Sequence, residues 1–394
     1  MPTTRGWAAL GAGAALVILW VSVGERLLLA VAAFLLLSVG LGMLYVRFSA
    51  PRVAIDRVLT PFQVHDGDRA VVEVTLVASR RIYQVVVEDE VHGLGSAHFV
   101  ADRVEPRDPM VARYEILCRP RGIYRVGPAD VRVRDPLGLT EAGGNAGGAD
   151  RLVVYPAVED LDGLPLGRGQ DPSVNTSRAS FANQGGEDFF TLREYQQGDD
   201  LRKVHWPSSA KRDELMIKQL EMPWQSRALV LFDPRRANHP GVESFEHAVR
   251  GAASVLRHLY ANGYTPTLWA GRGSGTIVAS AEAYAIAMEE LAVVQPEVDL
   301  DLQAMVAKMR RGGMAGGVMV LVTGPPDDDD LGAFRVLGRD FYRTVVMSVA
   351  DRTNEGILQF ARAGAATAVT PTTGSWAQVW KEAMERTWST ATAG

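Results

Sequence analysis

The chain contains very little cysteine and lysine, and the scarcity of cysteine excludes several classes of site. Cys118 is the only cysteine among 394 residues, which excludes an intrachain disulfide, a cysteine-rich zinc site and a CxxC redox motif. Without disulfides, the soluble part is expected to face a reducing compartment. Only five of the 41 basic residues are lysines, a skew that indicates genome base composition rather than selection for phosphate binding. The formal net charge is −5, so no overall basic field favours nucleic acid as a partner.

The rest of the composition is that of a folded protein with several parts. Hydrophobic residues make up 47% and charged residues 22%, as in ordinary globular chains. At about 100–200 residues per domain, the length allows roughly two to three domains. We predict four segments: a transmembrane helical hairpin (1–48), a β-sandwich (50–155), a linker with a charged motif (156–224) and a C-terminal α/β domain (225–390).

Two apolar runs stand near the N-terminus, Trp7–Val23 and Leu27–Val46, separated by Gly24-Glu25-Arg26. Each has about the length that crosses a bilayer, and a helix satisfies its own backbone groups in lipid. The pattern therefore predicts a helical hairpin embedded in the lipid bilayer. A signal peptide over residues 1–23 fits poorly, because no A-x-A-like site follows and a second apolar run comes at once.

The charges beside the two runs predict an orientation. Arg5 precedes the first run, and Arg47, Arg52 and Arg57 follow the second, while the short turn carries one charge of each sign. The positive-inside tendency then places both ends of the hairpin, and the soluble domains, in the cytoplasm.

Short β-prone runs alternate with turn residues between residues 50 and 155. Val72–Leu76 alternates apolar with polar residues, Ile82–Val87 is strongly β-prone, and turns such as Gly127-Pro128 punctuate them. This spacing predicts an antiparallel sandwich of about seven strands with an immunoglobulin-like architecture. Gly143–Gly148 is expected to be a flexible loop, because no strand-to-helix switch with a terminal Lys-Ser/Thr follows it.

A dense group of charged and aromatic residues follows the linker. Its candidate site residues are Arg193, Glu194, Tyr195, Gly198, Asp199, Asp200, Arg202, His205, Trp206 and Lys211. Nucleic-acid binding is disfavoured here, because residues 187–221 contain more acidic than basic side chains.

Several interpretations of this motif stay open. Asp199 is placed to cap a short helix. The charged residues could form a network that holds the loop to a neighbouring domain, anchored by a buried Trp206. Alternatively, Arg193, Arg202 and Trp206 form a recognition surface, since Arg and Trp dominate many interfaces. A catalytic or metal site at Asp199, Asp200 and His205 has weaker support, because adjacent side chains seldom converge on one ion.

The C-terminal part alternates strands with helices. Arg227–Asp233 has the pattern of a buried parallel strand that ends in a loop carboxylate. Further strands are predicted at 265–270, 318–323, 344–350 and 366–370, and helices at 243–260, 281–294, 299–311, 353–363 and 375–388. This alternation predicts a doubly wound parallel sheet. Asp327–Asp330 lacks the spacing of an EF-hand loop and is expected to be a solvated loop or a helix N-terminus.

The motif resembles the signature of the domain-of-unknown-function 58 (DUF58) family of bacterial membrane proteins, roughly R-E-Y-x-x-G-D-D-x-R-x-x-x-W-x-x-x-A-R. Arg193–Lys211 follows this pattern, with Lys211 in place of the last arginine and Pro207 after the tryptophan. The upstream segments Arg121–Pro128 and Asp135–Leu139 also resemble that family.

The resemblance implies a von Willebrand factor A-like C-terminal domain, in which the first strand normally ends in D-x-S-x-S and holds a divalent cation. Asp233 occupies the Asp position, but Arg235 and Ala237 replace the two serines. Losing two hydroxyl ligands and gaining a positive charge disfavours Mg²⁺ there, so we expect a degenerate site without metal.

The functional expectation is a membrane-anchored adaptor or scaffold without a cofactor and without a readable catalytic constellation. The resemblance implies a MoxR-type AAA+ ATPase as partner, in protein remodelling or envelope physiology at the bacterial cell membrane, where other envelope membrane proteins are further candidates. Two alternatives remain: a hydrolase-type enzyme centred on residues 193–211, or a purely structural membrane protein whose motif joins the two soluble domains.

Overall fold

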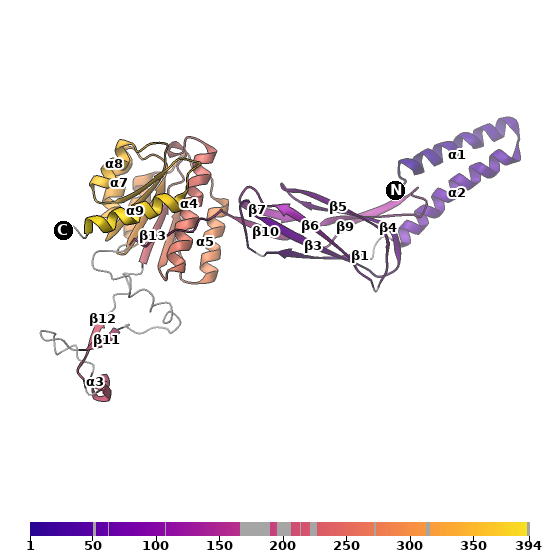
Figure 1. Cartoon of the computed structure of the whole chain (residues 1–394). Helices are drawn as coiled ribbons and strands as arrows, with labels where there is room; N and C mark the ends of the chain where they lie inside the picture. Colours follow the sequence, from indigo (N-terminus) through magenta and orange to yellow (C-terminus); the bar gives the residue numbers. More distant parts are fainter. Residues whose placement is uncertain are drawn as a thin grey trace. The chain divides into compact units, whose positions relative to one another are not determined.

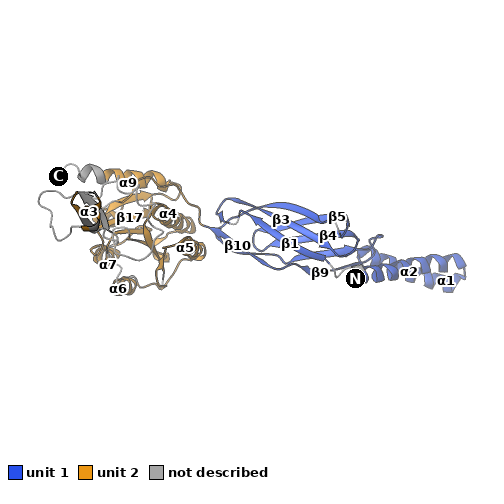
Figure 2. Ribbon diagram, turned by 90° about the horizontal axis from the view of Figure 1, so that it is seen from below, with its two compact units in different colours: residues 1–155 blue, residues 156–394 orange. Residues whose placement is uncertain are grey.

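The computed structural model describes residues 1–49, 53–61, 63–106, 108–165, 190–194, 206–212, 214–220, 227–271, 273–312 and 316–391. The chain forms two compact units, Met1–Tyr155 and Pro156–Gly394, which Figure 2 distinguishes by colour. Each unit is built around its own sheets.

The first unit begins with two antiparallel helices, α1 (Thr4–Val23) and α2 (Arg26–Ser49), visible in Figure 1. Both are long and apolar enough to cross a membrane. Gly24 ends α1 in a left-handed conformation (φ 77°), which glycine adopts without steric cost. The helices touch where glycine allows it, since a Cβ at Gly13 would lie 3.0 Å from the Leu36 side chain.

Ten strands follow the helices in two sheets. The smaller sheet has the order β1 (Val53–Thr60), β3 (Arg69–Ala78), β6 (Met110–Leu117). The larger sheet has the order β2 (Val64–His65), β10 (Asp150–Tyr155), β7 (Gly122–Val126), β4 (Ile82–Val91), β8 (Ala129–Arg134), β9 (Glu141–Ala146), and β5 (Gly95–Val104) pairs with β4. All pairings are antiparallel except β2 with β10.

Alternating burial along the strands builds the core between the two sheets. In β3, every second side chain is buried, as the period of two requires. Val72 and Val74 from the smaller sheet share a core with Val126 and Val154 from the larger one. The β-rich prediction is confirmed, but the loop expected at Gly143–Gly148 is wrong for its first four residues, which lie in a strand.

Gly143, Gly144, Asn145 and Ala146 belong to strand β9, which pairs with β8 over its whole length, and Gly147 and Gly148 follow the strand. A Cβ at Gly143 would lie 2.6 Å from the carbonyl oxygen of Val131. Glycine therefore allows the close approach of this edge strand, and the run of glycines that suggested a loop is a packing feature.

A buried ion pair lies inside the sandwich. The Arg57 guanidinium donates to Asp89 through Nη2 (2.8 Å) and Nε (3.0 Å), and the Tyr114 hydroxyl donates to the same carboxylate (2.7 Å). The side chains of Arg57 and Asp89 are 1% and 0% exposed. Burial, aided by the hydrogen bond to Asp89, raises the pKa of Tyr114. Arg57 is thus paired inside the domain, although the sequence counts it among the charges that follow the second apolar run.

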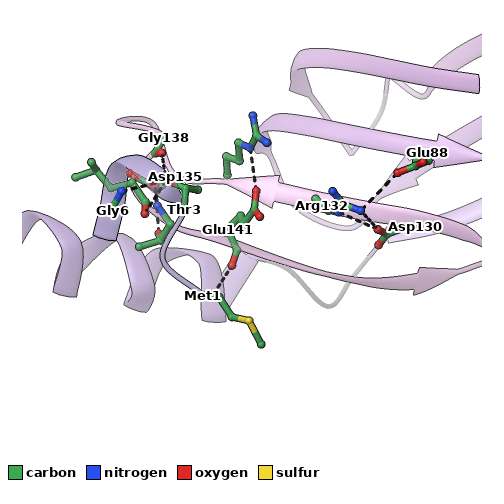
Figure 3. Close-up of polar contacts among 12 residues, drawn as sticks. Met1, Thr3, Gly6, Glu88, Asp130, Arg132, Asp135, Gly138 and Glu141 are labelled. Atoms are coloured by element: carbon green, nitrogen blue, oxygen red, sulfur yellow. Dashed lines mark hydrogen bonds and ion pairs between the residues drawn. The ribbon is translucent and has the colours of Figure 1, made fainter. Parts of the chain in front are cut away.

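The N-terminus is joined to a turn of the sandwich, the Asp135–Thr140 turn (Figure 3). Thr3 donates its backbone N–H to Leu139 (2.9 Å) and its hydroxyl to Gly138 (2.7 Å). Within the turn, the buried Asp135 carboxylate accepts the backbone N–H of Leu137 (3.0 Å) and the hydroxyl of Thr140 (3.1 Å). Because these bonds hold the turn from inside, it forms a stable platform for the start of α1.

The second unit contains a six-stranded sheet with helices on both faces (Figure 1). The strand order is β15 (Thr276–Ile277), β14 (Thr265–Ala270), β13 (Arg227–Phe232), β16 (Val318–Thr323), β17 (Arg343–Val349), β18 (Ala366–Thr370). The helices are α4 (Val242–Ala261), α5 (Ala281–Val293), α6 (Leu302–Arg311), α7 (Asp328–Gly338), α8 (Glu355–Arg362) and α9 (Trp376–Ala391). The pairings from β14 to β18 are parallel, and β15 is antiparallel to β14.

This arrangement is the doubly wound α/β sheet that the sequence predicts, with the first strand at the centre. Leu229 and Leu231 of β13 pack with α6, α7 and α8. On the opposite face, the buried aromatic ring of Phe232 packs edge-on against Phe245 of α4. The predicted strands and helices are present with boundaries shifted by only a few residues.

A connecting segment leads into this unit and is fixed to α4 and α9. The Glu159 carboxylate accepts the Ser375 hydroxyl (2.7 Å) and the Ala377 N–H (3.1 Å) at the start of α9. The Trp380 indole and the His258 ring both contact the Gly163 carbonyl, each at 2.9 Å. This segment is therefore an ordered part of the α/β unit.

His247 lies at the centre of the same packing. Its ring is stacked on Trp376 with centroids 5.0 Å apart, and the residue is 4% exposed. Burial lowers the pKa of His247 to about 4, with a smaller contribution in the same direction from Arg250 and an opposing one from Glu159. The folded protein therefore holds this imidazole neutral.

Acid should destabilise the protein through His247. The unfolded chain binds the proton near pH 6.5 and the folded chain only near pH 4, so stability falls as the pH drops through that window. The loss reaches about 3 kcal/mol by pH 4. We expect His247→Phe, which keeps the stack on Trp376, to remove this part of the pH dependence in urea unfolding of the detergent-solubilised protein. Equal pH profiles for wild type and variant would contradict the assignment.

Candidate functional site at the carboxyl edge of the parallel sheet

The carboxyl ends of β13 and β16 meet at the point where the strand order reverses. Connections from these two neighbouring strands lead to opposite faces of the sheet, and in doubly wound folds ligands bind in the crevice at this position. Asp233 follows β13 directly, and Thr323 is the last residue of β16. Both side chains are fully buried, so the fold itself brings polar groups together at this edge.

Asp233 accepts hydrogen bonds from three neighbouring side chains. Oδ2 accepts from the Thr323 hydroxyl (2.9 Å) and the Asn238 amide (2.9 Å). The Arg235 guanidinium binds both carboxylate oxygens, with Nε 2.9 Å from Oδ1 and Nη2 2.8 Å from Oδ2. The fork geometry of arginine makes this the strong, bidentate form of the contact.

Asp330 supplies the second carboxylate. Its Oδ1 lies 2.7 Å from Nη1 of Arg235, and its Oδ2 accepts the Asn238 amide at 3.0 Å. Asp330 also completes a capping box with Asp327 at the start of α7, in which each side chain accepts the backbone N–H of the other. The predicted helix N-terminus is confirmed, but Asp330 is 1% exposed rather than solvated.

We call Asp233, Arg235 and Asp330 the ion triad. One guanidinium sits between two carboxylates, and its side chain is only 15% exposed. Burial opposes the charge on Arg235, but hydrogen bonds to Asp233 and Asp330 outweigh it and raise the arginine pKa. Arg235 therefore keeps its positive charge between the two carboxylates.

His239 holds the backbone of Asp233, the first member of the triad. Its Nε2 lies 2.8 Å from the Asp233 carbonyl oxygen, and its ring packs against Phe232 and Phe245. Because a carbonyl only accepts, we assign the proton of the neutral ring to Nε2. Burial lowers the pKa of His239, so the ring acts as a neutral donor that orients the loop carrying Asp233.

The loop after β16 passes very close to the loop after β13. A Cβ at Gly324 would lie 1.5 Å from the Asn238 carbonyl oxygen, so only glycine fits at this crossing. The Ser348 hydroxyl at the end of β17 holds the Gly324 carbonyl at 2.8 Å. Asn238 is thereby placed where its amide can bridge both carboxylates.

The divalent cation that the family resemblance implies does not fit these residues. Both oxygens of Asp233 are engaged by Arg235, Asn238 and Thr323. Arg235 was expected to repel a metal ion, whereas its guanidinium itself lies between the two carboxylates and supplies the positive charge. Ala237 is exposed and offers only a methyl group. At the carboxyl edge of the sheet, the Arg235 guanidinium thus occupies the position between the carboxylates where a metal ion would bind.

The structure describes only part of the charged motif. Arg193 and Glu194 lie in β11 (Phe190–Glu194), which pairs with β12 (Met216–Leu220), so that Glu194 is opposite Met216. Trp206 and Lys211 lie in α3 (Trp206–Arg212). Tyr195, Gly198, Asp199, Asp200, Arg202 and His205 lie outside the described residues.

Trp206 is 66% exposed. It is therefore not the buried anchor that the charge-network interpretation of the motif expected. The inward face of α3 is occupied instead by Ser209, whose hydroxyl accepts the N–H of Met216 at 2.9 Å. Both of these residues are buried. Lys211 is exposed as well, so α3 presents an aromatic ring and a cation to solvent.

Sequence reasoning found Asp233 and Arg235 but missed Asn238, Thr323 and Asp330. Thr323 and Asp330 become visible only when the carboxyl ends of two parallel strands are placed side by side. Their signal in the sequence is a polar residue at the end of the second central strand and an acidic helix N-terminus after it, read together with the strand order.

Removing the guanidinium should strongly destabilise the α/β unit. Arg235→Met keeps much of the side-chain volume but leaves two buried carboxylates without their cation, at a cost of about 3–5 kcal/mol. Urea unfolding of the full chain in detergent measures the loss. Arg362→Met is the matched control, because Arg362 pairs with Glu355 on the surface, with side chains 68% and 60% exposed, where such pairs contribute little.

The same unfolding curves should not respond to Mg²⁺ in the wild type, since Arg235 already neutralises the site. Equal losses in Arg235→Met and Arg362→Met would contradict the triad. So would a Mg²⁺-dependent gain in stability that Asp233→Asn abolishes.

Comparisons with known proteins place the chain in a family. The model of the family described as "Protein of unknown function DUF58" matches residues 191–388. A curated relative, the uncharacterised protein YeaD of Bacillus subtilis, is 32% identical over 213 residues, covering 51% of each chain. The chain thus spans about half the length of that relative.

Solved structures that match this chain do so with low scores. The CARDB domain of a Pyrococcus furiosus protein, solved with di-metal ions, is 16% identical with a TM-score of 0.21, and covers 26% of this chain and 88% of its own. The sporulation control protein Spo0M of Bacillus subtilis is 10% identical with a TM-score of 0.14, and covers 26% of this chain and 49% of its own. These scores are too low to support an argument about fold or function.

Proposed function

Because this chain belongs to the DUF58 family, whose function is unknown, we propose its role from the site: it is a membrane-tethered adaptor whose α/β unit binds a protein partner. The observation that supports this most is the ion triad. At the position where doubly wound domains place reactive or ligand-binding groups, the polar side chains bind one another through Arg235. A closed, rigid edge suits a binding scaffold better than a catalyst.

The α/β unit is, in this proposal, a von Willebrand factor A-like module. Supporting this, its third strand in sequence lies antiparallel at the edge and its first lies at the centre. The sandwich, of immunoglobulin-like type, then serves as a spacer between the module and the helices.

The helices α1 and α2 form the tether, and the soluble domains lie in the cytoplasm. Arg5 and Arg47 flank the ends of the hairpin that adjoin the sandwich, and both are exposed. This charge distribution supports a cytoplasmic location by the positive-inside tendency. Other envelope membrane proteins could then meet the adaptor within the bilayer.

The partner that we propose is a MoxR-type AAA+ ATPase, which the family resemblance suggests. The exposed ring of Trp206 and the exposed Lys211 on α3 support a recognition surface in this segment. Large aromatic side chains contribute strongly to binding energy when a partner covers them.

We expect the tagged full-length protein, captured from detergent-solubilised native membranes, to retain the ATPase in a manner that differs between ATP and ADP. Trp206→Ala should reduce the retained ATPase at least tenfold, equivalent to about 1.4 kcal/mol. Immunoblotting of the captured fraction measures this. Tyr342→Ala is the control, because Tyr342 is a similarly exposed aromatic residue (63%) that directly precedes β17 and lies outside the motif.

If neither nucleotide yields the ATPase, the proposed partner is wrong. If both variants bind it as well as the wild type does, the ATPase remains the partner but α3 is not its docking surface.

A further inference from the structure

The Asp135–Thr140 turn lies beside the first residues of the chain, directly before helix α1. Glu141 donates its N–H to Met1 (2.8 Å), and Thr3 donates to Leu139 (2.9 Å), so the two segments run antiparallel (Figure 3). Because of this antiparallel pairing, the chain from Leu139 towards Leu137 runs in the same direction as the chain from Thr3 into α1.

Both helices touch this turn through glycine. A Cβ at Gly6 would lie 2.0 Å from the Leu139 carbonyl oxygen. A Cβ at Gly42 of α2 would lie 2.8 Å from the Thr140 hydroxyl and 3.2 Å from the Asp135 carboxyl carbon. These contacts leave no room for a side chain at either position, so the turn is seated directly against the hairpin.

The length of α1 sets the depth of the turn relative to a bilayer. From Gly6 to Val23, the helix rises about 26 Å at ~1.5 Å per residue, close to the ~30 Å of a hydrocarbon core. If the polar Gly24-Glu25-Arg26 turn lies at one membrane surface, Gly6 lies at the other. The Asp135–Thr140 turn, which contacts Gly6, lies at that same surface.

The side chains at this level have the chemistry of a membrane interface. Leu137 is 60% exposed and Trp7 is 64% exposed, although large apolar groups at a soluble surface gain nothing from water. Tryptophan is enriched at the headgroup level of membranes. Arg5, exposed in the first turn of α1, can pair with a lipid phosphate.

We propose that the Asp135–Thr140 turn is a membrane-contact turn, which places Leu137 among the lipid headgroups beside Trp7. The proposal rests on the proposed tether and goes beyond it, because it fixes the sandwich against the bilayer instead of leaving it free on a linker. The occupant of this surface is the headgroup region of the bilayer in which α1 and α2 are embedded.

Fluorescence quenching in nanodiscs of phosphatidylcholine and phosphatidylglycerol tests this. In a Cys118→Ala background, an environment-sensitive dye is attached at Leu137→Cys, and nitroxide lipids carry the quencher either on the headgroup or at mid-chain. We expect the headgroup nitroxide to quench this dye at least twofold more than the mid-chain nitroxide.

Two labelled positions serve as controls. Phe34→Cys in the middle of α2, where Phe34 is 67% exposed, should show the reverse preference. His92→Cys should show no quenching, because His92 (side chain 82% exposed) follows β4 at the end away from the turn, as the pairing of Val85 with Val133 and of Glu88 with Asp130 shows.

A dye at Leu137 that behaves like the one at His92, while Phe34 is quenched at mid-chain, would overturn the membrane-contact turn and leave the tether intact. An unquenched dye at Phe34 would overturn both the tether and the proposal that rests on it.

Discussion

The contact of one guanidinium with two buried carboxylates organises the carboxyl edge of the α/β unit. Arg235 joins the loop after β13 to the first turn of α7, two segments that are distant in the sequence. Without this cation, Asp233 and Asp330 would repel one another in a region shielded from water. The crossing at Gly324, the bridging amide of Asn238 and the neutral ring of His239 all depend on the two loops being held together.

The first unit also contains a buried arginine–aspartate pair, in a different fold. Arg57 and Asp89 pair inside the sandwich, and Tyr114 completes the hydrogen bonding of the carboxylate. Buried ion pairs add little net stability compared with apolar packing, but breaking one partner is costly. We infer that in both units the pairs act mainly to specify one arrangement of neighbouring strands and loops, which suits a molecule that we propose to work as a scaffold.

The sequence predicts the elements of the fold well and their polar contacts poorly. Apolar periodicity located the helices and the parallel strands, because each depends on residues close together in the chain. The prediction for Gly143–Gly148 failed in part because a run of glycines is typical of a loop. Here, glycine at 143 lets strand β9 approach the backbone of β8 closely. Arg57 misled because its partner Asp89 is far away in sequence, on another strand.

The same limitation applies to the candidate site. Asp233 was identified because it ends an apolar strand, and Arg235 because it replaces an expected serine. That Arg235 would bind Asp233 and Asp330 together, instead of only repelling a metal ion, depends on which strands are neighbours. No local pattern reports that order, so Asp330 looked like one acid in an acidic run.

A double-mutant cycle tests the central claim most directly, that Arg235 and Asp330 act as one unit across the carboxyl edge. Arg235→Met, Asp330→Asn and the double variant are compared with the wild type by urea unfolding of the full chain. The account predicts a coupling energy of about 1–3 kcal/mol, the range for groups in direct contact. Losses that simply add, within about 0.5 kcal/mol, would contradict it.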